Sequence, residues 1–400
     1  MLASRVGVQH IESVEDAVQS ALIIAYETWK IKEVPENPSA WLYKVAFNNI
    51  ISGLRQNTHR QRILADNPDL NKNLAKADPN TFLVGEVKDD LLRMLFVCCD
   101  KEIPPDSQLV FALKTLCGFS IPEIALRLFT SEANTYKRLE RARNCLRKIA
   151  PNKSPLDINE IQSIEIKSRI PAVNRVLYSL FTEGYFSSHI NQAIRRELCE
   201  EAIRLAKILA EHPAGQNPET SALIALMYLH SARMASRIDD MGGLLLLEEQ
   251  NRKGWDKQRI HIGLQWLAKS AQGQEFSRYH AEAGISAEHC LATSFEETNW
   301  TKIVECYDLL ERDSDSALHR LNKAVAVAEW KGPEEGLAVV EGFQPPTWLE
   351  GSYLWCAVLA DLHRRCGNKK KAQHHGKIAL NLAPSNRIKE LLKRRLAMGD

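Results

Sequence analysis

Hydrophobic residues along the chain recur at steps of three and four positions, and alternating segments rich in Val, Ile and Thr are not evident. A period near 3.6 residues is the pattern of amphipathic helices, whereas strands alternate with a period of two. Proline and glycine fall between the helical segments, for example at Pro104-Pro105, Gly118, Pro171 and Gly332-Pro333. These residues end helices or form turns. The pattern therefore predicts an all-α protein.

The breaks divide the chain into blocks. Residues 66–88 are polar, hold Asn, Asp, Lys and Pro, and lack a strong period, so they are predicted to be a linker. A second break is expected around Pro151 and Pro155. The predicted organisation is a helical unit at 1–65, a linker at 66–88, a second helical unit at 89–150, a linker at 151–170 and a helical block at 171–400.

The second unit has the pattern of a helix-turn-helix. A helix begins near Pro104, with Asp106 or Ser107 predicted as its cap, and it ends near Gly118. Ser120 and Glu123 stand three residues apart, as in a capping box, and Pro122 sits in the first turn of the short helix that follows. Phe129-Thr130 is predicted to form the turn, and the next helix is capped by Ser131 or Thr130.

In a helix-turn-helix the second helix enters the major groove and its first residues reach base edges. The residues in that position are Glu132, Asn134, Thr135, Lys137 and Arg138, and Arg141, Arg143, Arg147 and Lys148 are suited to phosphates. A basic, solvated helix in an ordinary bundle is the alternative interpretation. The net charge of the chain is only +2, but Arg55–Arg62 holds no acid and Lys137–Lys148 holds one. Two local basic patches on a nearly neutral chain indicate two contacts with a polyanion.

Composition narrows the class of protein. The chain is 44% hydrophobic and 26% charged, and its mean hydropathy is −0.29. No apolar run approaches the ~20 residues that cross a bilayer, and the first residues lack the order of a secretory signal. The nine cysteines include no Cys-x-x-Cys pair, so we expect reduced thiols in a cytoplasmic protein, with no metal and no cofactor.

The residues of the two basic units resemble a known family. Gly118–Ala125 and Ser131–Leu146 are similar to the upstream-element-binding domain of extracytoplasmic-function sigma factors of RNA polymerase, in the sigma-70 superfamily. Asp16–Gln19, followed by Ala21–Trp29, resembles the helix of those factors that binds the polymerase clamp. Asn37–Asn49 resembles the helix that binds and melts the downstream promoter element. The resemblance implies core RNA polymerase and promoter DNA as partners.

The resemblance also implies roles for single residues. Asp16 and Gln19 would contact polymerase. The residues expected to contact DNA are Trp41, Lys44, Asn48, Asn49 and Arg55 in the first unit, and Asn134, Thr135, Lys137, Arg138 and Arg141 in the second. Aromatic and polar side chains beside positive charge suit the binding of a single DNA strand with unstacked bases. Trp41 and Phe47, however, also fit a buried core.

Three features depart from the family pattern. Its members usually carry about one more helix before the Asp16 segment, which predicts a misassigned start or a trimmed polymerase-binding domain. Ser20 stands where an acid is usual, which weakens the expected docking, and Asp100 follows Cys98-Cys99 where relatives commonly have His.

The remaining block resembles the extension of one subgroup of these factors, which has a tetratricopeptide-like C-terminal domain. Pro171–Tyr185 and Leu244–Asp256 carry that resemblance. Gly332 precedes Gly367 by 35 residues, close to the ~34-residue period of the repeat. Stacked helix pairs form a concave groove, so we expect a regulatory domain that binds a protein or peptide there.

Two alternatives to this function stay open. The chain could be a repeat-domain interaction or ligand-sensing protein that keeps a sigma-like N-terminal half without initiating transcription. The second alternative is an enzyme, because charged residues that could line an active site gather within a short stretch of the extension. They are His230, Arg233, Arg237, Asp239, Asp240, Glu248 and Glu249. Neighbours on a helix point in different directions, and no HExxH, phosphate-binding glycine loop or nucleophile elbow is present, so we predict no catalysis.

Overall fold

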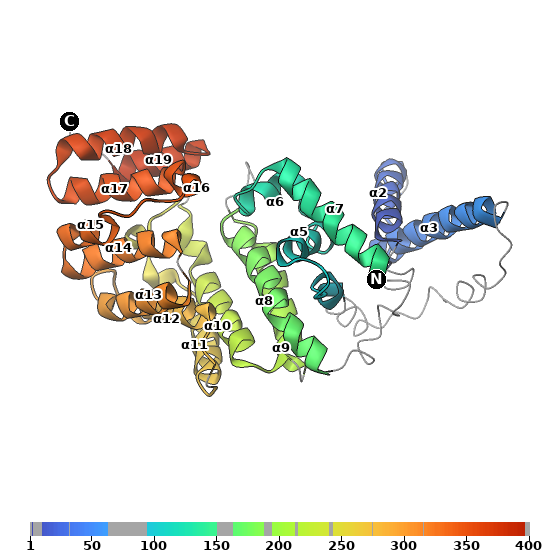
Figure 1. Cartoon of the computed structure of the whole chain (residues 1–400), viewed down its shortest axis with the longest axis horizontal. Helices are drawn as coiled ribbons and strands as arrows, with labels where there is room; N and C mark the ends of the chain where they lie inside the picture. Colours follow the sequence, from blue (N-terminus) through green and yellow to red (C-terminus); the bar gives the residue numbers. More distant parts are fainter. Residues whose placement is uncertain are drawn as a thin grey trace. The chain divides into compact units, whose positions relative to one another are not determined.

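The structure is a computed structural model of the 400-residue chain. It describes residues 2, 10–31, 33–62, 94–149, 163–187, 194–212, 215–239, 243–273, 275–314 and 316–396. Within these ranges the chain is helical, with a single isolated bridge between Ile238 and Leu244 and no strand (Figure 1). The predicted all-α class is confirmed. The chain divides into two compact units, 1–176 and 177–400.

The first unit opens with a helical pair, α2 (Ile11–Thr28) and α3 (Pro38–Arg62). Small apolar side chains at helical spacing, such as Ala17, Ala21 and Ala25, form the buried face of α2. Helix α3 contacts α2 and buries Ala46 and Ile50. Alanine at these positions lets the two backbones approach closely while still removing apolar surface from water.

Three further helices follow in the same unit: α5 (Pro105–Thr115), α6 (Ile121–Arg127) and α7 (Glu132–Ile149). They enclose a core that includes Phe111, Ile124 and Leu139, each buried. The predicted cap of the first helix is wrong. The N-cap is Pro104, which makes no side-chain hydrogen bond, because Pro105 starts the helix before Asp106 and Ser107.

The second predicted linker also differs from the structure. Residues 150–162 lie outside the described ranges, but α8 (Ser163–Tyr185) begins inside the expected linker and contains Pro171 in its interior. A buried ion pair holds this stretch of helix against an earlier part of the unit. Arg169 Nη2 lies 2.6 Å from Asp100 Oδ2, and Arg169 Nη1 donates to the Phe96 carbonyl oxygen at 2.9 Å. Tertiary partners such as these outweigh a local helix breaker.

The second unit is a succession of helices. They are the end of α8, α9 (Arg196–Glu211), α10 (Pro218–Ala232), α11 (Lys257–Ser270), α12 (Arg278–Leu291), α13 (Trp300–Asp313), α14 (Ala317–Lys331), α15 (Pro333–Val340), α16 (Thr347–Glu350), α17 (Tyr353–Arg365), α18 (Lys369–Leu382) and α19 (Asn386–Arg395). Helix α10 is buried on nearly every side and contacts α9, α11 and α12. It is the centre of this half of the unit.

Short turns join neighbouring helices near the C-terminus (Figure 1). Gly332 (φ 108°), between α14 and α15, and Gly367 (φ 74°), between α17 and α18, both adopt positive φ, which only glycine adopts at no steric cost. Gly336 lies so close to Ala328 that an added Cβ would stand 2.6 Å from the alanine Cβ. Ala360 of α17 and Ala379 of α18 are fully buried.

Candidate nucleic-acid and polymerase interface

Helices α6 and α7 form the predicted helix-turn-helix. The capping box is present: the Ser120 amide donates to Glu123 Oε2 at 2.7 Å, and the Glu123 amide donates to Ser120 Oγ at 3.4 Å. The turn passes through Phe129, whose φ of 49° lies in the left-handed region. Ser131 then caps α7, because its Oγ accepts the Asn134 amide at 3.2 Å. These local bonds fix where the second helix begins.

The exposed side of α7 carries most of the residues predicted to reach DNA. Asn134, Lys137 and Arg141 are exposed. Arg138 is half-buried and forms an ion pair with Asp106 Oδ2 at 3.4 Å. Thr135 is fully buried, and its hydroxyl donates to the Ser131 carbonyl oxygen at 3.1 Å. The expectation that Thr135 reads a base is therefore wrong, since its hydroxyl bonds the helix backbone inside the unit.

Helix α3 presents the second set. Trp41, Lys44 and Asn48 stand at i, i+3 and i+7, so they share one face of the helix. Lys44 and Asn48 are exposed, and Asn49 is half-buried. Trp41 is also half-buried, and its ring centroid lies 5.4 Å from that of Trp29, the C-cap of α2. The indole thus packs between the helices and also reaches the surface. This position is compatible both with a place in the core and with contact to DNA.

Arg55 lies within α3, but its side chain lies outside the described residues. Phe47, the other aromatic residue with two interpretations, stacks on Tyr43 with 6.0 Å between ring centroids. Both rings are half-buried.

Helix α2 exposes more than the two predicted polymerase contacts. Asp16 and Gln19 are both exposed. The same face continues with Ile23 and Tyr26, which are 60% and 66% exposed. Sequence reasoning missed these two residues, although their spacing of four and seven from Gln19 was available as a signal. Large apolar side chains gathered on one exposed helix face are typical of a protein-binding surface.

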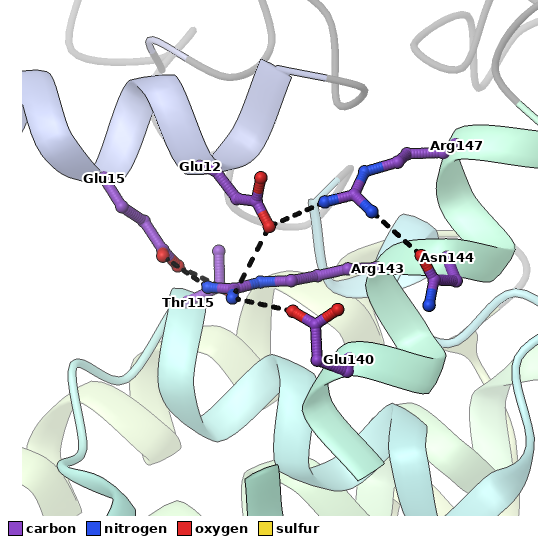
Figure 2. Close-up of polar contacts among 7 residues, drawn as sticks. All are labelled: Glu12, Glu15, Thr115, Glu140, Arg143, Asn144 and Arg147. Atoms are coloured by element: carbon purple, nitrogen blue, oxygen red, sulfur yellow. Dashed lines mark hydrogen bonds and ion pairs between the residues drawn. The ribbon is translucent and has the colours of Figure 1, made fainter. Parts of the chain in front are cut away.

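The first turns of α2 contact α7 through charged side chains (Figure 2). Arg143 Nη2 lies 2.8 Å from Glu15 Oε2, and Arg143 Nη1 lies 3.6 Å from Glu12 Oε1. Arg147 Nη2 lies 2.7 Å from the same Glu12 oxygen. Arg143 is well covered in this arrangement, with 16% of its side chain exposed. Two of the three arginines predicted to hold phosphates therefore bind carboxylates of the same unit.

The charged stretch of the extension has structural partners. Arg394 of α19 contacts Glu249 Oε2 at 3.1 Å and Asp239 Oδ2 at 4.0 Å. His230 is buried, and burial together with the positive charge of Arg233 lowers its pKa to about 3. Asp240 lies outside the described residues. Asp239 and Glu249 of this set are therefore held in ion pairs with a helix near the end of the domain.

Burial raises the pKa of the Cys99 thiol to about 12, so this thiol stays protonated at neutral pH. No group of three or more His, Cys, Asp or Glu side chains within the described ranges is arranged to hold a metal ion. Among the helices that the structure describes, none combines the length and apolar character needed to cross a membrane.

Comparison with known proteins matches three parts of the chain to families. Residues 2–60 match Sigma-70 region 2, residues 93–146 match Sigma-70, region 4, and residues 169–271 match a family of unknown function, DUF6596. An uncharacterized protein of Rhizobium meliloti (strain 1021) is 32% identical over 339 residues, which cover 83% of this chain and 78% of that protein. No solved structure matches the chain.

The order of these matches is that of a sigma factor: region 2 holds α2 and α3, and region 4 holds the helix-turn-helix. Sigma-70 factors direct RNA polymerase to promoters and are not enzymes. The chain belongs to the same family as the Rhizobium meliloti protein, and it is a sigma factor of the extracytoplasmic-function type that carries a helical C-terminal domain.

Proposed function

We propose that this sigma factor binds core RNA polymerase through the exposed face of α2, melts the downstream promoter element with α3 and reads the upstream element with α7. The helical C-terminal domain regulates these steps. The observation that carries the first part is the face of α2 formed by Asp16, Gln19, Ile23 and Tyr26. Its polar and apolar groups are exposed, and its opposite side is buried against α3.

The contact between α2 and α7 supports a closed state of the factor. Glu12 and Glu15 precede Gln19 at i−7 and i−4, so they continue the same stripe of α2 that ends at Ile23 and Tyr26. A guanidinium that is paired with a carboxylate is not free to pair with a phosphate. Polymerase docking on this stripe and phosphate binding by Arg143 therefore both compete with the closed contact.

Co-elution with core RNA polymerase on a sizing column tests the docking surface. The full chain should co-elute, and the double variant Ile23→Ser, Tyr26→Ser should not. Phe276→Ser with Leu291→Ser is the matched control, because these two side chains are 49% and 59% exposed in the other unit. Equal co-elution of both double variants would show that this face of α2 does not dock polymerase.

Promoter selection tests α7. The side chains of Lys137 and Arg138 stand in the first half of the helix, where base edges are reached. Alanine at both positions should reduce transcription from the cognate promoter relative to unrelated promoters. Unchanged selectivity would contradict the assignment of α7 as the reader.

A chain that lacks the C-terminal domain tests whether this domain regulates transcription. The residue at which the chain is shortened decides whether the first unit keeps its buried ion pair. A chain that ends near residue 165 loses Arg169 and leaves Asp100 buried without its ion pair. A chain that ends at Val176 keeps that pair and the whole first unit. Its transcriptional output should differ from that of the full chain, and an unaltered output would refute a regulatory role.

The paired helices at α14–α15 and α17–α18 support a tetratricopeptide-like arrangement, in which a groove would take a regulatory protein or peptide. The alternative function is an interaction or ligand-sensing protein that no longer initiates transcription. A folded full chain that binds neither polymerase nor promoter DNA would favour it.

A further inference from the structure

The last forty residues carry a strong positive charge that the sigma function does not account for. Residues 361–400 hold 11 of the 52 lysines and arginines of the chain, but only 3 of its 50 acids. Because the net charge of the chain is only +2, the rest of the molecule is acidic. The positive charge is therefore concentrated on the end of the helical extension, in α17, α18 and α19.

Some of these basic residues hold the fold together. Arg364 and Arg395 both pair with the buried Asp361, at 2.8 and 3.1 Å, and Arg365 pairs with Glu329. Arg394 binds Glu249. These four arginines have internal carboxylate partners, so they explain only part of the charge.

A second group has no such partner. No carboxylate in the described ranges pairs with these side chains, and five of the six are exposed. We name this group the C-terminal basic surface. Its members are Lys369, Lys370, Lys371, Lys377, Arg387 and Lys389.

The position of three of these lysines is unfavourable for the isolated domain. Lys369, Lys370 and Lys371 form the first turn of α18, which contains no acid. The N-terminal end of a helix is its positive end, and a cation there is unfavourable. The N-cap residue Asn368 makes no side-chain hydrogen bond that would offset this. These lysines break the usual preference for acids at the start of a helix, and no bond inside the domain compensates for it. Such a departure indicates that the residues serve a function.

The register of α18 keeps its charge away from the core. Ala372, Gly376 and Ala379 are buried at i, i+4 and i+7. Lys370 and Lys377 are exposed and lie on the opposite side of the helix. Seven residues of helix span about 10 Å, which is the axial length of about three phosphates on one DNA strand. This face of the helix thus offers two ammonium groups at a spacing that suits a polyanion.

We propose that the C-terminal basic surface binds the phosphate backbone of duplex DNA without reading its sequence, while the first unit holds the promoter. This inference rests on the proposed promoter binding, which supplies DNA to the surface at high effective concentration. Lysine suits this role because it acts as a point charge and positions the protein without reading bases. Protein-binding surfaces depend instead on large apolar or aromatic anchors. Leu382, 41% exposed, is the single large apolar side chain of α18 and α19 that stands out from the surface.

The test uses the full chain and a fluorescent 30-base-pair duplex of random sequence, with anisotropy measured over a range of salt concentrations. In the test variant, Lys369, Lys370, Lys371 and Lys377 are all changed to Gln. The control variant changes four exposed lysines elsewhere on the extension to Gln, so that both variants lose the same charge. The control residues are Lys207, Lys253, Lys257 and Lys269.

Each phosphate contact contributes about 0.9 to the slope of log K against log salt concentration. The test variant should therefore lower that slope by about 2 to 4, whereas the control variant should leave it near the value of the unaltered chain. Equal slopes for the two variants would overturn the proposal. Loss of binding to polyglutamate with unchanged binding to the duplex would also overturn it, in favour of an acidic protein partner.

A third variant separates this inference from the proposed sigma function. Lys137→Ala with Arg138→Ala alters α7 and leaves the basic surface intact. A lowered slope in the lysine-to-glutamine variant, together with unchanged promoter selectivity in the α7 variant, would support the surface and contradict promoter reading by α7. The reverse pair of results would support α7 and refute the surface.

Discussion

The contact between α2 and α7 gives the sharpest prediction about the state of the factor. The change is Glu12→Gln with Glu15→Gln, which removes both carboxylates and keeps the size of the side chains. The Arg143–Glu15 pair is the most covered, with 16% and 25% of the two side chains exposed, and it should contribute about 1 kcal/mol. The Arg147–Glu12 pair is almost half exposed on both sides, so it should contribute about 0.5 kcal/mol.

Together these pairs favour the closed state by about 1.5 kcal/mol, which corresponds to a factor of about ten in the equilibrium between closed and open states. When the closed state predominates, the apparent dissociation constant for DNA is raised by the inverse of the open fraction. The double variant should therefore bind promoter duplex up to about tenfold more tightly than the unaltered chain. The gain should shrink at high salt, because both the closed contact and the DNA contact are screened.

Fluorescence anisotropy with a labelled promoter duplex measures this change. Removing two acids also makes the chain more positive, which by itself strengthens DNA binding. Glu27→Gln with Glu33→Gln is therefore the control, since both side chains are exposed. Glu27 stands in the last turn of α2 and Glu33 follows the helix, whereas Glu12 and Glu15 make the contact from its first turns. If the control pair tightens binding as much as Glu12→Gln with Glu15→Gln, the closed contact has no role in DNA binding.

Three further predictions concern stability, and denaturant unfolding of the full chain measures each. Asp100→Asn should lower the free energy of unfolding by about 3 kcal/mol, because it leaves the buried Arg169 without its carboxylate; a loss below 1 kcal/mol would contradict a structural role for the pair. Ser120→Ala removes the capping box of α6 and should cost about 1 kcal/mol, and an unchanged midpoint would show that the cap is redundant. The pKa of His230 is lowered to about 3 in the folded state, against about 6.5 when unfolded. The unfolded chain therefore takes up a proton first, and stability should fall as pH decreases from about 6.5 towards 3, by up to about 1.4 kcal/mol per pH unit; the same pH slope in His230→Gln would refute this cause.

Much of the interface could be predicted from local sequence signals. The capping bonds of Ser120, Glu123 and Ser131 join groups that are three residues apart. The spacing of these residues along the chain is therefore enough to predict their role as caps. The exposed positions of Lys44, Asn48, Lys137 and Arg141 follow from the helical period in the same way. The position of Thr135 was not predicted in this way. It was expected to reach DNA, and only the packing of α7 shows that its side chain faces inward.

The sequence by itself therefore determined the helical class, the helix-turn-helix and the basic character of α7, because each depends on the order of residues within one or two turns. Tertiary structure alone decided which charges meet. Glu15 and Arg143 are 128 positions apart, and Asp100 and Arg169 are 69 apart, so no local pattern joins them. It also decided that Pro171 lies within a helix, since the residues on either side of it, such as Arg169 and Val173, are buried in the folded unit and hold the segment in place. Local bonds are fixed by spacing along the chain, whereas the partners of long charged side chains are fixed by how the helices pack.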